Sequence, residues 1–285
     1  MNVNDLKVFQ AVAAHGSFTK AAEAMFTVQS NVTARIKALE DEFGTQLLAR
    51  TSRKVTLTDA GEKLIQYSKQ ITQLVEEARL AVSAQDQVVG HLKIGCIETS
   101  LALRIPGVIN LFSEQYPDVA LEFVSGNSPG LIQDVLRHKL DAAFVSTPID
   151  FPELEQCFVK KDKLVIVSGV NTTLKAILAE KTVRTVVFDQ GCSYRERLES
   201  WFNAKGISRY RCTVVNTMEG IINFVEAGVG ITVLPEELID KFYGKRKLQK
   251  FPLGRDLNVM STVLVFRKRA TQSRALQAFA DTFKD

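Results

Sequence analysis

Side chains able to read DNA bases are concentrated in one short segment near the N-terminus. Val32, Ile36 and Leu39 are spaced as one apolar side of a helix. The opposite side and the N-terminal tip carry Gln29, Ser30, Thr33 and Lys37. Gln bonds adenine through two hydrogen bonds, Ser and Thr bond either base, and Lys neutralises phosphate. We therefore expect this helix to enter the major groove of double-stranded DNA. A solvated polar face would give the same pattern for a helix taken alone.

A basic turn follows this helix. Residues 51–54 (TSRK) lie between the apolar segments 47–48 and 55–57, a pattern typical of a two-stranded wing. Arg50, Arg53 and Lys54 supply cations suited to contact with the DNA backbone or minor groove. Because helix, tight turn, helix and basic wing occur together, residues 1–58 are predicted to form a DNA-binding domain.

Small polar residues begin four predicted helices in the C-terminal two-thirds of the chain. Free N–H groups at a helix start, with a short polar side chain beside them, suit a carboxylate or similar anion. The same residue types are also ordinary helix caps. The candidate effector-binding residues, including one that follows a strand, are Thr99, Ser100, Asn127, Ser128, Thr147, Cys192, Ser193 and Thr217.

Cys192 admits two interpretations. It lies at a predicted helix start beside Arg195, and both features lower the pKa of a thiol. A redox sensor would use such a thiol, with Cys212 as the required partner. We favour the simpler interpretation, in which Cys192 is a small polar residue lining a pocket.

Catalytic patterns do not occur in the sequence. His15, His91 and His138 lie far apart, and no HExxH, GxSxG or P-loop glycine pattern is found. We expect neither catalytic residues, nor a metal site, nor a cofactor. A secreted solute-binding protein is the other class considered, but it would have no use for residues 1–58.

Composition excludes several classes of protein. The 285 residues are 46% hydrophobic and 24% charged, which is too apolar and too balanced for a disordered chain. The net charge of +4 means that DNA binding must come from a local patch. No signal peptide or membrane-spanning run is visible, and the four cysteines lack CxxC spacing. We expect a cytoplasmic protein with no membrane partner.

A long helix is predicted to link the DNA-binding domain to the rest, over residues 59–88. Two interleaved seven-residue repeats run along it: Leu64, Ile71, Ala78 and Tyr67, Leu74, Ala81. Such a seam is typical of a helix that pairs with a second helix. We favour homodimerisation through this helix over packing against the chain's own C-terminal domain.

Strand and helix patterns alternate from residue 89 to the end, which indicates α/β layers. The pattern predicts two lobes, one formed by residues 89–161 and 267–285 and the other by residues 162–266. Strands are expected over 91–97, 119–124, 142–145, 164–167, 183–188, 213–215, 231–234 and 262–266. Helices are expected over 100–115, 131–138, 194–204, 218–227 and 273–283. A cleft between two such lobes is a common place for a small ligand.

Motifs along the whole chain resemble the LysR-type transcriptional regulators. Residues 16–22 (GSFTKAA), 29–40 (QSNVTARIKALE) and 43–51 (FGTQLLART), running into 57–61 (LTDAG), resemble their winged helix-turn-helix. Residues 90–95 (GHLKIG), 139–143 (KLDAA) and 225–235 (VEAGVGITVLP) resemble their effector domain.

The resemblance implies a homodimer or a tetramer built from dimers, with an effector domain of the periplasmic-binding-protein type. It also implies binding to interrupted palindromes near promoters, modulated by a small metabolite. Two residues depart from the family pattern. Val28 stands where a Ser or Thr cap is usual, so Thr27 is expected to cap the helix. Ala34 stands where Arg is common, and the neighbouring Arg35 points about 100° away from that face.

Overall fold

The computed structural model describes residues 1–50, 54–82, 88–170, 173–254, 256–268 and 272–283. The chain divides into two compact units, which are described separately. The first unit is Met1–Gln87 together with Arg137–Lys139, and the second comprises Val88–Leu136 and Leu140–Asp285.

Three helices, a small hairpin and a long helix make up the first unit. In chain order they are α1 (Val3–His15), α2 (Phe18–Ala24), α3 (Gln29–Phe43), β1 (Leu48–Arg50), β2 (Val55–Leu57) and α4 (Asp59–Val82). Phe9, Val12, Ile36 and Leu39, each at most 1% exposed, lie in one apolar core that joins α1 to α3.

Caps fix where the first helices begin and end. Asn2 and Asp5 form a reciprocal capping box at the start of α1. Gly16 ends α1 with a φ of 59°, in the left-handed region that glycine adopts without strain. Ser17 then caps α2, so only two residues separate the helices. The turn of the predicted helix-turn-helix comes next, over residues 25–28 between α2 and α3, because α3 is the helix expected to read DNA.

The hairpin and α4 meet at Gly61. Strands β1 and β2 pair antiparallel, with Leu48 opposite Leu57. A Cβ atom at Gly61 would lie 2.1 Å from the Leu47 carbonyl oxygen. The hairpin can therefore approach the first turn of α4 only because residue 61 has no side chain.

The first lobe of the second unit is built on three parallel strands. Its elements are β3 (Gly90–Cys96), α5 (Glu98–Leu103), α6 (Ile105–Gln115), β4 (Val119–Ser125), α7 (Ser128–Leu136), β5 (Ala142–Ser146) and the C-terminal α12 (Arg274–Asp281). Strand β3 lies between β4 and β5. Phe112, Phe144 and Phe279 form part of one core, so the C-terminal helix packs on this lobe.

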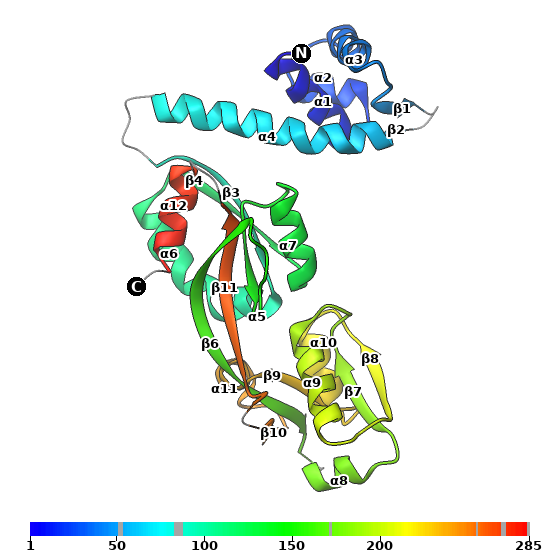
Figure 1. The fold of residues 1–285 in the computed structure, drawn as a ribbon, viewed down its shortest axis with the longest axis vertical. Helices are drawn as coiled ribbons and strands as arrows, with labels where there is room; N and C mark the ends of the chain where they lie inside the picture. Colours follow the sequence, from blue (N-terminus) through cyan, green and yellow to red (C-terminus); the bar gives the residue numbers. More distant parts are fainter. Residues whose placement is uncertain (51–53, 83–87, 171–172, 255, 269–271, 284–285) are drawn as a thin grey trace. The chain divides into compact units, whose positions relative to one another are not determined.

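Two long strands run from the first lobe into the second (Figure 1). They are β6 (Leu154–Gly169) and β11 (Val259–Arg267), and they pair antiparallel with a register shift between Thr262 and Val263. With β9 (Thr232–Pro235) and β10 (Leu248–Pro252) of the second lobe, the resulting sheet has the order β10-β6-β11-β5-β3-β4, and β9 also pairs with β6.

The second lobe has a separate two-stranded parallel sheet. The elements of the second lobe are α8 (Leu174–Ala179), β7 (Val183–Val187), α9 (Ser193–Ala204), β8 (Tyr210–Val214), α10 (Met218–Glu226), β9 (Thr232–Pro235), α11 (Glu236–Tyr243) and β10 (Leu248–Pro252). Strands β7 and β8 are parallel. Trp201 and Phe202 of α9, both at most 2% exposed, are central to the core.

The structure differs from the sequence-based expectation in several elements. The single helix expected over 100–115 is two helices, because the chain breaks at Arg104, two residues before Pro106. Helices α8 and α11, strand β10 and the first ten residues of β6 were not predicted. Among the described residues, no helix is long and apolar enough to cross a membrane.

Candidate DNA-reading helix and ligand pocket

Helix α3 presents the predicted base-reading residues as the apolar spacing indicated. Val32, Ile36 and Leu39 are buried on its inner side. On the outer side Gln29, Ser30 and Lys37 are exposed, and Thr33 is partly buried. Thr19 of α2 donates a hydrogen bond from its hydroxyl to Gln29 Oε1 at 3.2 Å. This bond orients the Gln29 amide and leaves its NH₂ group available to a base.

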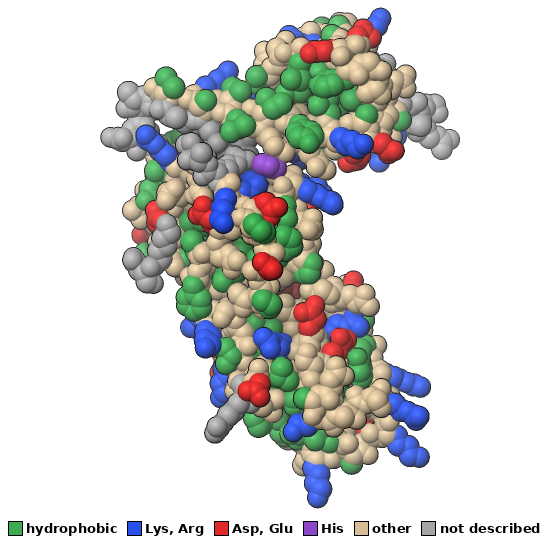
Figure 2. Space-filling view, viewed as in Figure 1, with side chains coloured by type: hydrophobic (Ala, Val, Ile, Leu, Met, Phe, Trp, Pro, Cys, Tyr) green, Lys and Arg blue, Asp and Glu red, His purple; other side chains and the backbone are tan. Residues whose placement is uncertain are grey.

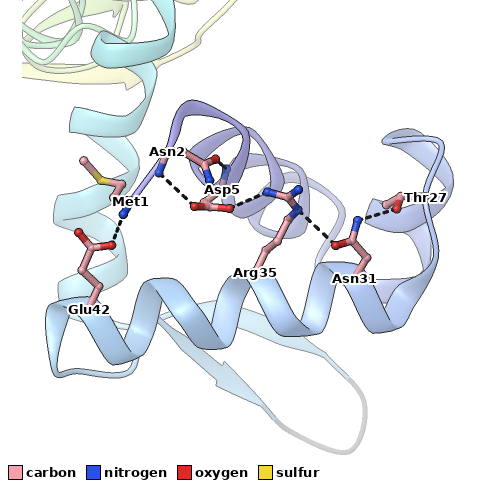
Figure 3. Close-up of polar contacts among 7 residues, drawn as sticks. All are labelled: Met1, Asn2, Asp5, Thr27, Asn31, Arg35 and Glu42. Atoms are coloured by element: carbon pink, nitrogen blue, oxygen red, sulfur yellow. Dashed lines mark hydrogen bonds and ion pairs between the residues drawn. The ribbon is translucent and has the colours of Figure 1, made fainter.

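Arg35 does not share the outer face, as the helical angle predicted. Its Nη1 lies 2.8 Å from Asp5 Oδ1 of α1, and its Nε donates to Asn31 Oδ1 at 3.3 Å (Figure 3). Asn31 in turn donates to Thr27 Oγ1 at 2.9 Å. These polar contacts tie the N-terminal half of α3 to α1 and to the turn before it.

The expectation that Thr27 caps α3 is wrong. Val28 is the N-cap residue and provides no side-chain hydrogen bond, while the Thr27 hydroxyl accepts from the Asn31 side chain instead. Because Val has no polar atom to offer, the first turn of α3 begins without a side-chain cap. This helix end thus offers backbone N–H groups next to Gln29 and Ser30.

The wing is described only in part. Lys54 is exposed just before β2. Arg50 belongs to β1, but its side chain lies outside the described residues, as does the whole of Arg53. The three basic residues of the wing, like the outer-face residues of α3, therefore stay predictions as DNA contacts.

The two predicted seven-residue repeats of α4 have different surroundings. Leu64 is buried and Ile71 partly buried against the core of the first unit. Tyr67 and Leu74 are 62% and 51% exposed, and hydrophobic side chains recur along α4 in Figure 2. Leu64 and Ile71 of one repeat thus serve the chain's own core, whereas Ala78 of that repeat is exposed, as are Tyr67 and Leu74 of the other repeat. The side chain of Ala81 is outside the described residues.

A pocket of about 300 Å³ lies at the carboxyl ends of the parallel strands in the second unit. Ser125 and Ser146 are the last residues of β4 and β5, and Phe188 and Asn216 follow β7 and β8. Ligands of open α/β sheets are found at this end of the strands. The full lining is Ile97, Glu98, Thr99, Ser125, Gly126, Asn127, Ser128, Ser146, Phe188, Asp189, Cys192, Ser193, Tyr194 and Asn216.

All four predicted helix starts contribute to this pocket, the fourth through Asn216 rather than through the predicted Thr217. The predicted residues that line it are Thr99, Asn127, Ser128, Cys192 and Ser193. Ser100 is 2% exposed and lies behind the lining, and Thr147 follows β5 outside it. Thr217 caps α10 by accepting from Gly220 N at 3.2 Å. All eight predicted residues, whether or not they line the pocket, stay predictions as ligand contacts.

Hydrogen bonds join the two lobes around the pocket. The hydroxyl groups of Thr99 and Tyr194 are 2.7 Å apart. Asn127 Nδ2 donates to the Gln190 carbonyl oxygen at 3.2 Å. Glu98 Oε1 accepts from Met218 N at 3.1 Å. The pocket is therefore enclosed by elements that are already linked across the lobes.

The thiol of Cys192 is less acidic than its position at a helix start predicts. Burial raises the pKa of its thiol, and this effect outweighs the N–H groups of Tyr194 and Arg195, which lower it. The helix start and the nearby cation were the right features to identify, but desolvation exceeds both. Within the described chain, all four cysteines are free thiols, and Cys212 is exposed.

Nine of the fourteen lining residues are outside the predicted set of ligand contacts: Ile97, Glu98, Ser125, Gly126, Ser146, Phe188, Asp189, Tyr194 and Asn216. Glu98 is adjacent to Thr99 at a predicted helix start, and Asp189 lies three residues before Cys192, but the prediction named only small residues at these helix starts. Burial of Tyr194 is a property of tertiary packing that spacing does not reveal. Among the described residues, no group of three His, Cys, Asp or Glu side chains could hold a metal ion.

Comparison with known proteins covers the whole chain. Residues 3–62 match the family model described as the bacterial regulatory helix-turn-helix protein, lysR family, and residues 85–285 match the LysR substrate binding domain. The relative YusT of Bacillus subtilis strain 168, described as an uncharacterized HTH-type transcriptional regulator, is 38% identical. The match covers 99% of this chain and 95% of YusT.

Solved structures show the same fold. A full-length OxyR variant from Pseudomonas aeruginosa matches 100% of this chain and 95% of its own, with a TM-score of 0.76 and 19% identity. Full-length CbnR complexed with its target DNA matches 100% and 99%, with a TM-score of 0.71 and 20% identity. At these identities the likeness concerns the fold.

Proposed function

This chain belongs to the LysR family of transcriptional regulators, and from that premise we propose that a small metabolite bound in the second unit modulates its sequence-specific binding to DNA. One observation carries the proposal. A single chain combines a helix with an exposed base-reading face and an enclosed pocket at the strand ends. An enzyme would need the pocket but not the base-reading helix, so we also propose that the chain has no catalytic role. Because its proposed partner is DNA, we propose that it acts in the cytoplasm.

The DNA half of the proposal assigns roles within α3. Gln29, Ser30 and Thr33 face base edges, and Lys37 faces a phosphate. The uncapped first turn of α3 adds backbone N–H groups for a second phosphate. Ala34 contributes no contact, and Arg35 is occupied by Asp5, so this face is less basic than the family pattern implies. Arg50, Arg53 and Lys54 complete the contacts from the wing.

Selection of binding sites from random duplex DNA by the purified full chain tests this half. We expect enrichment of an interrupted palindrome, because a symmetric dimer presents two copies of α3. The exposed repeat of α4, represented by Tyr67 and Leu74, supports self-association through this helix. Recovery of unenriched sequences at physiological salt would contradict sequence-specific binding.

The effector half assigns the pocket to a small molecule that carries an anionic group. Hydroxyl groups and the start of α9, whose N-cap residue Cys192 makes no capping hydrogen bond, are suited to such a group. A metabolite at 100 times its Kd should stabilise the folded chain by about 2.7 kcal/mol. Thermal unfolding against a metabolite panel measures this, and S193A and N127A should reduce the shift.

A second candidate is redox sensing through Cys192. The fold shared with the OxyR variant and the location of Cys192 in the pocket lining are the observations in its favour. The raised pKa of this thiol weakens it, since the thiolate is the reactive form. A change in DNA affinity on mild oxidation that C192S abolishes would favour this candidate over a metabolite effector.

A further inference from the structure

The charged side chains in the pocket lining are both acidic. Glu98 and Asp189 are the charged residues among the fourteen that line it, and no Lys, Arg or His is among them. In the described ranges, neither carboxylate forms an ion pair with a basic side chain. Two uncompensated negative charges around a cavity of about 300 Å³ oppose the entry of a purely anionic molecule.

Each carboxylate has one oxygen engaged by the backbone. Glu98 Oε1 accepts from Met218 N at 3.1 Å, at the start of α10. Asp189 Oδ1 accepts from Gln190 N at 2.7 Å. Over the described part of the chain, their second oxygens accept no hydrogen bond from protein. Both residues can therefore bind a cationic donor without losing the contacts that hold them.

Donors for a negative group lie in the same pocket. Helix α9 begins at Ser193, which lines the pocket, so its hydroxyl and the positive end of the helix dipole are available to an anion, whereas the N–H groups of Tyr194 and Arg195 interact with the Cys192 thiol. Ser128 Oγ accepts from Ser146 N at 3.1 Å, which leaves the hydroxyl proton of Ser128 free to be donated. The pocket thus has acceptors for a cation and donors for an anion.

We infer that the ligand of this pocket is zwitterionic: a small molecule with a protonated amine toward Glu98 and Asp189 and a carboxylate toward the start of α9. The inference rests on the proposed effector site and narrows its ligand to amino acids and their close derivatives. A simple carboxylic acid would leave both acidic side chains facing a like charge, which is destabilising.

Three matched classes of probe test this inference on the full chain. They are the L-amino acids, the 2-hydroxy acids that lack the amine, and the amines that lack the carboxylate. Thermal unfolding identifies binders, and calorimetric titration gives their Kd. We expect binding among the amino acids, with roughly tenfold or greater loss for the analogue that lacks either group.

Two variants separate charge from structure. E98Q keeps the Oε1 acceptor for Met218 N, and D189N keeps the Oδ1 acceptor for Gln190 N, so each removes only the negative charge. Both should weaken binding of the amino acid by roughly tenfold. E114Q, on the exposed surface of α6 and outside the lining, is the control and should bind like the wild type.

The outcomes distinguish this inference from the effector proposal. Equal affinity for a 2-hydroxy acid and its amino acid, together with unchanged affinity in E98Q and D189N, would contradict the inference that the ligand is zwitterionic. The proposal that this pocket binds an effector would still hold. Absence of stabilisation by all three classes would count against the effector site itself.

Discussion

Thr99 and Tyr194 are 95 residues apart in sequence, and their hydroxyl oxygens lie 2.7 Å apart in the wall of the pocket. Thr99 is on α5 of the first lobe and Tyr194 on α9 of the second, and their exposures are 3% and 6%. Burial raises the pKa of Tyr194, so its phenol stays protonated and remains a donor. A ligand entering the pocket meets both lobes at this bond.

Removing one partner of this bond should cost more than removing both. T99V or Y194F leaves a buried hydroxyl unsatisfied, and each should lower the free energy of unfolding by about 1–3 kcal/mol. Urea unfolding of both single variants and of the double variant measures the coupling. Additive losses would mean that the two hydroxyl groups do not interact.

Acid should weaken the second unit through Glu237. Arg104 donates to both oxygens of Glu237 at 2.9 Å, and this hydrogen bonding lowers the pKa of Glu237 to about 2 from its ordinary 4.5. Because the folded pKa is depressed, this stability is present above pH 4.5 and is lost as the pH falls toward 2. Stability curves between pH 6 and pH 2 should be flatter in E237Q, and parallel curves would contradict this role.

Substitution of Gly61 should separate the hairpin from α4. In G61A the new methyl group would lie 2.1 Å from the Leu47 carbonyl oxygen, so the backbone must shift. We expect a loss of about 1–3 kcal/mol and a weaker affinity for DNA. G107A is the matched control, because nothing lies within 4 Å of that Cβ position in α6. It should raise stability by about 0.4–1 kcal/mol, and similar effects of the two variants on stability would refute the packing argument.

Thiol reactivity should differ between the two cysteines of the second lobe. Cys212 is exposed, whereas burial raises the pKa of Cys192. Iodoacetamide at pH 7.5 should therefore modify Cys212 first, as measured by mass spectrometry of timed samples. Faster modification of Cys192 would contradict the shielding described for it and strengthen the redox candidate.

Apolar periodicity was sufficient to predict the main elements of the fold. The spacing of Val32, Ile36 and Leu39 identified the buried side of α3, and the helix starts at Asn127 and Ser193 led to the pocket. Capping of α3 failed as a prediction because the Thr27 hydroxyl is held by Asn31, a choice between two local partners that spacing does not decide. The pKa of Cys192 failed because desolvation depends on tertiary packing.

The acidic character of the pocket was not predicted from the sequence, although Glu98 lies next to Thr99. Small polar residues at helix starts suit an anion, and the prediction therefore named Thr99 but not its acidic neighbour Glu98. Its role depends on Met218, 120 residues away, whose N–H it accepts. Such pairings between lobes are set by the crossing strands β6 and β11, and neither the pairing register nor the full length of β6 follows from local pattern.

The most direct test of the account is the affinity of the full chain for its selected DNA site after the outer face of α3 is changed. In Q29A/T33A the core residues of α3 are untouched, so the protein should stay folded. Fluorescence anisotropy at 150 mM salt should show at least about tenfold weaker binding to the selected site, with binding to unrelated duplex DNA unchanged. Equal affinity of wild type and variant for the selected site would contradict the assignment of α3 as the reading helix.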